Sequence, residues 1–211
     1  MALSKGEKTR RRIIATANRL FNKEERLLGL NELASAMDES RSLITNHFPR
    51  KELLNLAIYE QYEKDLAAIA SSHGSESFQD WFALFSDVLD LIHEYRFALS
   101  YILLNPLKDR NLSEHIEKTY EMSRDNIRQR IEAMVHTGLL EERILNRENY
   151  DIFLFQYTNL SITWIISLKI YDKDAAYKDR KPVYIKGIMN CMEPYLTKAG
   201  RSDFEQGLAA I

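Results

Sequence analysis

Three apolar sets at helical spacing, separated by short polar breaks, dominate the first fifty residues of the chain. Over residues 9–21 the apolar side chains recur every three or four positions, which predicts an amphipathic helix. Residues 30–37 hold a second set, long enough for two helical turns. Asp38-Glu39-Ser40 then supplies a turn with Ser40 as an N-cap, and a third short helix ends before Pro49. The order of these pieces predicts a helix-turn-helix.

The remaining sequence also predicts helices. We expect them over residues 51–69, 78–104, 113–137, 147–171 and 182–199, with the second range divided in two near Glu94. Pro182 suits the first turn of the last helix, and Gly200 suits the position after its end. Only seven of the 211 residues are Gly and four are Pro, which argues against a loop-rich β fold. The expected fold is all-α, with a three-helix N-terminal helix-turn-helix domain over residues 1–50 and a helical domain over residues 51–211.

Charge is unevenly distributed along the chain. Residues 1–51 hold eleven Lys and Arg and six Asp and Glu, a net charge of +5, whereas the whole chain carries −2. A basic end on an acidic body is typical of a protein that brings one end to a polyanion. A solvated charged surface without a partner is the other interpretation that charge alone leaves open.

Neither the cysteine content nor the apolar segments indicate an exported or membrane protein. Cys191 is the only cysteine, so no disulfide forms within the chain. The most apolar segment, residues 152–168, is interrupted by polar side chains and predicts a buried helix rather than a membrane span. We therefore expect a cytoplasmic protein with no membrane partner. The apolar neighbours of Cys191 predict a small buried side chain, with a redox sensor as the alternative.

The sequence contains no recognisable catalytic signature. The five His form no metal-binding pair at helical spacing, and no nucleophile elbow, phosphate loop or dinucleotide fingerprint occurs. We expect that the protein is not an enzyme and that it uses no metal and no cofactor. Each His is interpreted as a structural residue.

A spaced series of residues runs through the helix-turn-helix and into the next helix. Its members are Thr9-Arg10, Ile13-Ile14, Ala17, Leu20-Phe21, Leu33-Ala34, Ser40, Ile44, His47-Phe48-Pro49, Lys51-Glu52 and Leu54. This series resembles the DNA-binding domain of the TetR family of bacterial transcriptional repressors, over about the first quarter of the chain. The resemblance implies a homodimer that binds a palindromic DNA operator, a helical C-terminal domain for ligand binding and dimerisation, and an unknown small-molecule effector.

The third short helix is the expected recognition helix. In the DNA major groove such a helix exposes hydrogen-bond donors on one face and buries apolar residues on the other. Arg41 suits guanine, Asn46 suits adenine, and Leu43 suits the methyl group of thymine. The residues expected to face DNA are Ser40, Arg41, Ser42, Leu43, Thr45 and Asn46. The resemblance adds the phosphate-contacting positions Thr9, Arg10, His47 and Lys51.

Several positions depart from the family pattern. Asp38-Glu39 replaces the usual Gly-Val in the turn, Ser42 replaces a glycine, and Thr45 replaces a tyrosine. Asp tolerates the left-handed backbone of such a turn, but two carboxylates beside the recognition helix are expected to repel phosphate. The alternative is a helical small-molecule-binding or interaction protein whose divergent helix-turn-helix no longer binds DNA. A helical non-haem oxygenase is a third class, and the lack of paired carboxylate and His ligands argues against it.

The helix expected over residues 147–171 is apolar on two sides. Phe153, Tyr157 and Trp164 line one side, whereas Ile162 and Ile166 lie on another. One side is expected to face its own core and the other a second subunit, with Ile162, Trp164 and Ile166 in the dimer interface. Residues that could line a ligand pocket are Tyr95, Tyr101, Tyr120, Phe153, Tyr157 and Asn159. Aromatic residues of an ordinary core are the alternative interpretation of this set.

Overall fold

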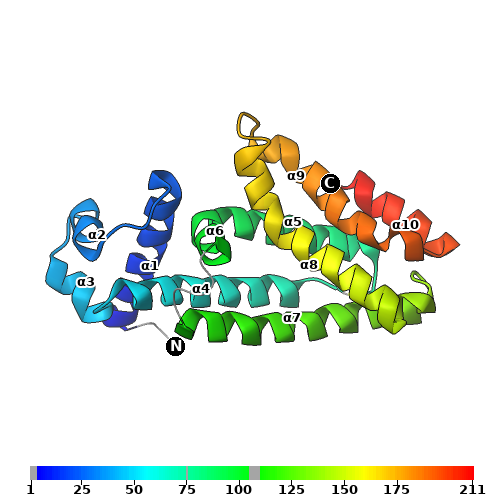
Figure 1. Cartoon of the computed structure of the whole chain (residues 1–211), viewed down its shortest axis with the longest axis horizontal. Coiled ribbons are helices and arrows are strands. Elements are labelled where there is room, and N and C mark those ends of the chain that lie inside the picture. Colours follow the sequence, from blue (N-terminus) through cyan, green and yellow to red (C-terminus); the bar gives the residue numbers. More distant parts are fainter. Residues whose placement is uncertain (1–3, 75, 105–109) are drawn as a thin grey trace. The chain divides into compact units, whose positions relative to one another are not determined.

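The computed structural model describes residues 4–74, 76–104 and 110–211 of the chain. These residues are mostly helical (Figure 1), and apart from one bridge between Leu140 and Leu196 they hold no β structure. The expected all-α fold is confirmed. The chain packs into two compact units, which we call the head unit (residues 1–66 and 91–113) and the body unit (residues 67–90 and 114–211). None of the described helices combines the length and the apolarity needed to span a membrane.

The head unit contains the predicted helix-turn-helix. Its helices are α1 (Lys5–Glu24), α2 (Leu30–Ala36), α3 (Arg41–His47), the first part of α4 (Lys51–Ser72) and α6 (Arg96–Leu104). At the start of α1 a capping box joins Ser4 and Glu7, whose side chains each accept the other's backbone N–H. The buried face of α1 is formed by Ile13, Ile14, Ala17, Asn18, Leu20 and Phe21. Apart from Asn18, this is the apolar face that the sequence predicts.

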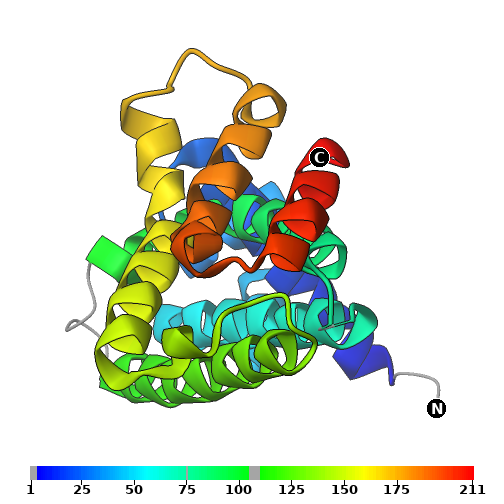
Figure 2. The same cartoon turned by 90° about the vertical axis from the view of Figure 1, so that its right-hand side faces the viewer.

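The body unit holds the longer helices. They are α5 (Phe78–Glu94), α7 (Arg110–His136), α8 (Arg147–Ile170), α9 (Tyr177–Met189) and α10 (Lys198–Ala209), with short 3₁₀ helices at Glu142–Leu145 and Asn190–Tyr195. The chain enters this unit within α4, leaves it within α5 and returns within α7. Figure 2 shows α8 in yellow, α9 in orange and α10 in red, and α8 packs against α9.

Aromatic side chains form the core of the body unit. The indole N–H of Trp81 donates to the hydroxyl of Tyr157 over 3.0 Å, and the ring of Phe85 meets that of Tyr157 edge-on. Phe204 of α10 packs edge-on against Phe78 and against the neighbouring Phe82. The C-terminal helix therefore closes the same core that α5 and α8 build.

The sequence-based prediction for the last helix is wrong. Residues 182–199 do not form one helix: Pro182 lies inside α9, Pro194 lies in a 3₁₀ helix, and α10 begins after Thr197. Gly200 does not end a helix but lies in the first turn of α10. A Cβ at Gly200 would come within 1.8 Å of the carbonyl oxygen of Leu139, so the glycine is needed for close packing of two backbone segments.

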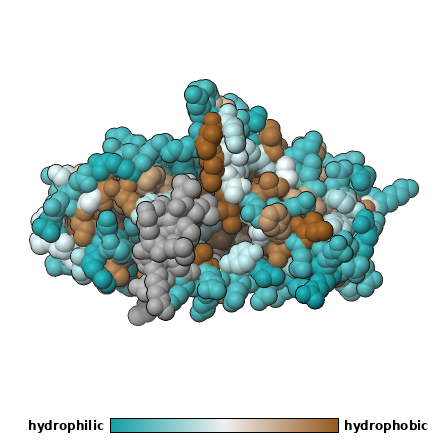
Figure 3. All heavy atoms as spheres, viewed as in Figure 1, coloured by the Kyte–Doolittle hydropathy of each residue, from teal (hydrophilic) through white to brown (hydrophobic). Residues whose placement is uncertain are grey.

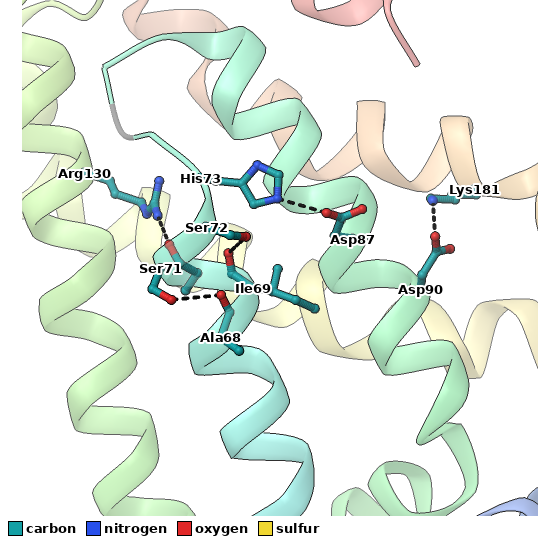
Figure 4. A network of polar contacts seen from close by, with 10 residues as sticks. Ala68, Ile69, Ser71, Ser72, His73, Asp87, Asp90, Arg130 and Lys181 are labelled. Atoms are coloured by element: carbon teal, nitrogen blue, oxygen red, sulfur yellow. Dashed lines mark hydrogen bonds and ion pairs between the residues drawn. The ribbon is translucent and has the colours of Figure 1, made fainter. Parts of the chain in front are cut away.

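In the body unit the C-terminal end of α4 is held by α7 (Figure 4). The guanidinium of Arg130 donates to the carbonyl oxygens of Gly74 at 2.8 Å and Ala70 at 3.2 Å. The imidazole Nε2 of His73 lies 2.9 Å from a carboxylate oxygen of Asp87. Arg130 therefore supplies a positive charge and two donors where the last carbonyls of a helix lack partners.

Candidate nucleic-acid interface

The predicted recognition helix, α3, is anchored at both ends and along one side. Ser40 caps its start, because its hydroxyl oxygen accepts the backbone N–H of Leu43 at 3.2 Å. Ile44 is fully buried, and Phe48, which ends the helix, is 1% exposed. These apolar anchors fix which side chains of α3 point away from the head unit.

The exposed face of α3 carries most of the predicted DNA-facing residues. Arg41, Ser42 and Asn46 are exposed, and Thr45, one turn after Arg41, is half-buried. The Thr45 hydroxyl donates to the carbonyl of Arg41 at 3.1 Å. Arg41, Ser42, Thr45 and Asn46 share one helix face, because residues three or four positions apart lie above one another on a helix. Leu43 and His47 are half-buried, and they lie beside this face.

The turn before α3 adopts a left-handed backbone at Asp38. Its φ of 53° lies in the left-handed region, which Asp tolerates better than most residues. The next residue, Glu39, forms an ion pair with the guanidinium of Arg12 on α1. One of the two carboxylates beside α3 is therefore paired with a cation, which weakens its repulsion of an approaching phosphate.

No local signal in the sequence predicts the Arg12–Glu39 pair. The two residues are 27 positions apart, and Arg12 lies on a helix face that is otherwise solvated. The pair forms only because the packing of the head unit brings α1 beside the turn.

The predicted phosphate-contacting residues lie on α1 and at the C-terminal end of α3. Lys51 is the exposed first residue of α4, directly after the α3–α4 link. The guanidinium of Arg10 lies over the Phe48 ring, 5.0 Å from its centroid, and joins α1 to the end of α3. Thr9 is half-buried, and its hydroxyl donates to the carbonyl of Lys5 in the same helix. The head unit thus places Thr9 and Arg10 on α1, His47 at the end of α3 and Lys51 at the start of α4.

The residues predicted to bind a ligand are divided between the two units. Phe153 and Tyr157 are packed in the core of the body unit, 5.4 Å between ring centroids, and burial raises the pKa of Tyr157. Tyr120 and Asn159 are exposed, and Asn159 donates to the carbonyl of Phe155 in its own helix. Tyr95 and the half-buried Tyr101 belong to the head unit.

The predicted interface residues separate into buried and exposed members. Trp164 is 3% exposed and stacks on Tyr177 within the body unit, with ring centroids 5.5 Å apart. Ile162 is exposed and Ile166 is half-buried, both on a different side of α8. Trp164 is therefore a core residue, whereas the other two lie where a second subunit could cover them.

An apolar surface follows α8 and reaches α9. The large apolar residues exposed there are Ile152, Phe155, Leu160, Ile162, Ile170, Tyr171 and Val183. Figure 3 shows hydrophobic surface over α8 with hydrophilic surface around it. A set of this size on neighbouring helices of a monomer indicates an interaction surface.

The structure also shows how possible metal ligands and the single cysteine are placed. Within the described residues, no group of three or more His, Cys, Asp or Glu is arranged to hold a metal ion. Cys191 is buried, and burial raises the pKa of its thiol, as for a small apolar side chain in a core.

Comparison with known proteins agrees with this architecture. The family model described as "TetR: Bacterial transcriptional repressor" matches residues 61–204, which is more than half of the chain. A solved TetR-family transcriptional regulator from Marinobacter aquaeolei VT8 superposes with a TM-score of 0.80 at 20% identity, over 95% of this chain and 96% of that chain. No curated protein matches the chain. Because the family model matches more than half of the chain, the chain belongs to the TetR family and is a transcriptional regulator.

Proposed function

We propose that the protein is a ligand-responsive repressor that binds a palindromic DNA operator as a homodimer. Residues 1–50 would bind DNA, and residues 51–211 would dimerise and respond to an effector. Because such a regulator acts where the chromosome is, we place it in the cytoplasm.

The observation that carries this proposal is the exposed face of α3. Arg41, Ser42 and Asn46 are exposed on a helix whose other side is anchored by Ile44 and Phe48. The length and exposure of this helix suit the major groove, where Arg reads guanine and Asn reads adenine. The pairing of Glu39 with Arg12 removes part of the repulsion that the turn would otherwise exert on DNA.

In the proposed complex the two kinds of contact have different roles. Arg41 and Asn46 bind base edges, and Leu43 contacts a thymine methyl group, whereas the hydroxyls of Ser40, Ser42 and Thr45 add short polar contacts. Phosphates are contacted by Thr9, Arg10, His47 and Lys51. The base contacts select the operator, and the phosphate contacts set register and much of the affinity.

The apolar surface of α8 and α9 supports the proposed homodimer. Isologous contact of this surface with its copy would cover Ile162 and Ile166, together with the more exposed Phe155. A two-fold dimer presents two recognition helices in opposed orientation, which is why a palindromic operator is expected.

The test is fluorescence anisotropy of the purified full chain with labelled duplex from upstream of its own gene. We expect specific binding that weakens steeply between about 50 and 200 mM salt. The double variant Arg41→Ala/Asn46→Ala should keep its helical circular dichroism and lose preference for that duplex. A folded wild-type chain that binds this duplex no better than a scrambled one would favour the alternative, a helical interaction protein with a vestigial head.

A further inference from the structure

The head unit contains a cavity of about 900 Å³ that the DNA-binding role leaves unused. Helix α1 supplies Arg11, Asn18, Arg19 and Lys23 to its lining, α4 supplies Asp65, and the first residue of α6 is Arg96. The volume falls in the range of small-molecule sites, roughly 300–1,000 Å³. The cavity is therefore large enough for a metabolite rather than for a single ion.

Cations outnumber the carboxylates that face this cavity. Arg11, Arg19, Lys23 and Arg96 line it, against Asp65 and one further carboxylate, that of Glu94. The Asp65 carboxylate is already occupied by the Tyr95 hydroxyl at 2.8 Å and by the Gln61 amide at 2.9 Å. In the part of the chain that the structure describes, Arg19 forms no ion pair, so its guanidinium is available to an anion.

One buried side-chain oxygen in the lining accepts no hydrogen bond from any residue that the structure describes. Asn18 is 5% exposed, and its amide nitrogen donates to the carbonyl of Glu94 at 3.0 Å. Its side-chain oxygen, in contrast, has no partner among the described residues. A buried acceptor without a donor is unfavourable, but this oxygen is not accessible to solvent, so a ligand donor reaches it only after the Asn18 side chain shifts.

The lining of the cavity comes from α1, α4 and the residues around the start of α6. Figure 1 shows α1 between the α2–α3 pair and α6, and α1 packs against α6. The lining contains no residue of α3. DNA bound by α3 therefore does not fill the cavity. The anion that fits the cavity is a free small molecule rather than a phosphate of DNA.

The cavity also borders the contact between α1 and the corner before α6. The side-chain amides of Asn18 and Asn22 both donate to the carbonyl of Glu94, and the side-chain oxygen of Asn22 accepts the backbone N–H of Phe97 at 3.0 Å. A molecule bound against these asparagines would change how α1 is held. Because α1 carries Thr9 and Arg10, such a change would reach the phosphate-contacting residues.

We propose that this cavity binds a small organic anion with more than one anionic group. The four cations of the lining offer several positive charges to one such ligand. Guanidinium groups bind carboxylate and phosphate alike. The regulatory consequence, altered operator affinity, rests on the proposed function, whereas the binding itself does not.

Calorimetric titration of the full chain without DNA, at constant ionic strength, tests the proposal. The probes are fructose 1,6-bisphosphate and citrate, with fructose and inorganic phosphate as controls for charge and for size. We expect at least one of the two larger anions to bind roughly tenfold more tightly than either control. Binding of the bisphosphate alone assigns phosphate groups to the natural ligand, and binding of citrate alone assigns carboxylates.

Variants locate the binding site. Arg19→Gln should weaken binding of the active probe roughly tenfold, whereas Lys8→Gln, an equal loss of charge on the exposed surface of α1 outside the cavity, should not. Both side chains are exposed, so neither variant is expected to change the fold.

Three results would overturn the proposal: no heat from either anion up to about 10 mM, equal binding of fructose, or equal weakening by Arg19→Gln and Lys8→Gln. Operator affinity is measured separately by anisotropy, with and without the active probe. A bound anion that leaves operator affinity unchanged overturns the regulatory part. A chain that binds the anion but no operator contradicts the proposed function and leaves the anion site standing.

Discussion

Arg41 and Lys51 are both exposed cations near the recognition helix, but they lie on different elements. Arg41 is the first residue of α3, so we expect Arg41→Ala to lose about 1–3 kcal/mol of binding free energy on the operator and little on other DNA. Lys51 begins α4, so Lys51→Ala should weaken binding to all sequences alike and reduce the salt slope by about one. Anisotropy titrations on operator and scrambled duplex, each at several salt concentrations, measure both effects.

The comparison of these two variants tests the placement of α3. A change of base preference in Lys51→Ala, together with unchanged preference in Arg41→Ala, would show that a different helix face enters the groove.

Labelling of Cys191 distinguishes a small buried side chain from a redox sensor. It is 9% exposed, and burial raises the pKa of its thiol, so the reactive thiolate is scarcer than in a free cysteine at the same pH. We expect Ellman's reagent at pH 8 to label the native chain far more slowly than the chain in denaturant. Rapid labelling of the native chain would instead favour the redox sensor.

Among the elements, the end of α4 depends on one side chain from α7. Removing the Arg130 guanidinium leaves the carbonyls of Ala70 and Gly74 without their charged donor. We expect Arg130→Met to lower the free energy of unfolding by about 1–3 kcal/mol. The control is Lys118→Met, an exposed cation on the same helix, with an expected change within about 0.5 kcal/mol. Urea denaturation of both variants measures the difference, and equal stabilities would contradict the role given to Arg130.

The start of α10 depends on a close backbone approach. A Cβ at Gly200 would meet the carbonyl oxygen and carbon of Leu139, which cannot rotate away as a side chain can. We expect Gly200→Ala to destabilise the chain by about 1–3 kcal/mol. Gly187→Ala, in α9 with open space around its Cβ, should instead be neutral or stabilise by up to about 1 kcal/mol. Thermal unfolding that ranks the two variants the other way would refute the packing argument.

For the whole molecule, the proposed homodimer depends on the exposed side of α8. Ile162→Glu would place a carboxylate without a partner in the proposed apolar interface, which costs several kcal/mol in such an environment. We expect this variant to be monomeric or aggregated in light scattering. Met122→Glu, at an exposed apolar position on α7, should leave the dimer intact.

Loss of the dimer should also remove operator binding, because useful affinity requires both half-sites to be occupied together. An Ile162→Glu chain that remains dimeric and still binds operator would place the interface on another surface. In that case the exposed apolar residues of α8 and α9 would require a different partner.

The sequence alone determined most of the helices and the family. Periodic apolar residues and capping residues act within a few positions, so the starts of α3 at Arg41 and α4 at Lys51 follow from local signals. The helix-turn-helix is recognisable for the same reason: its buried and exposed residues alternate at fixed short spacing.

Only the tertiary structure decided how distant segments meet. Gly200 was expected to end a helix, but its role follows from Leu139, a residue 61 positions earlier in the chain that no local pattern connects to it. The same holds for the Arg12–Glu39 pair, for the core position of Trp164, and for the cavity that α1, α4 and α6 line together. Helical periodicity shows that a face is apolar, but only packing determines which neighbour covers it, because burial and hydrogen bonding depend on contacts between segments far apart in sequence.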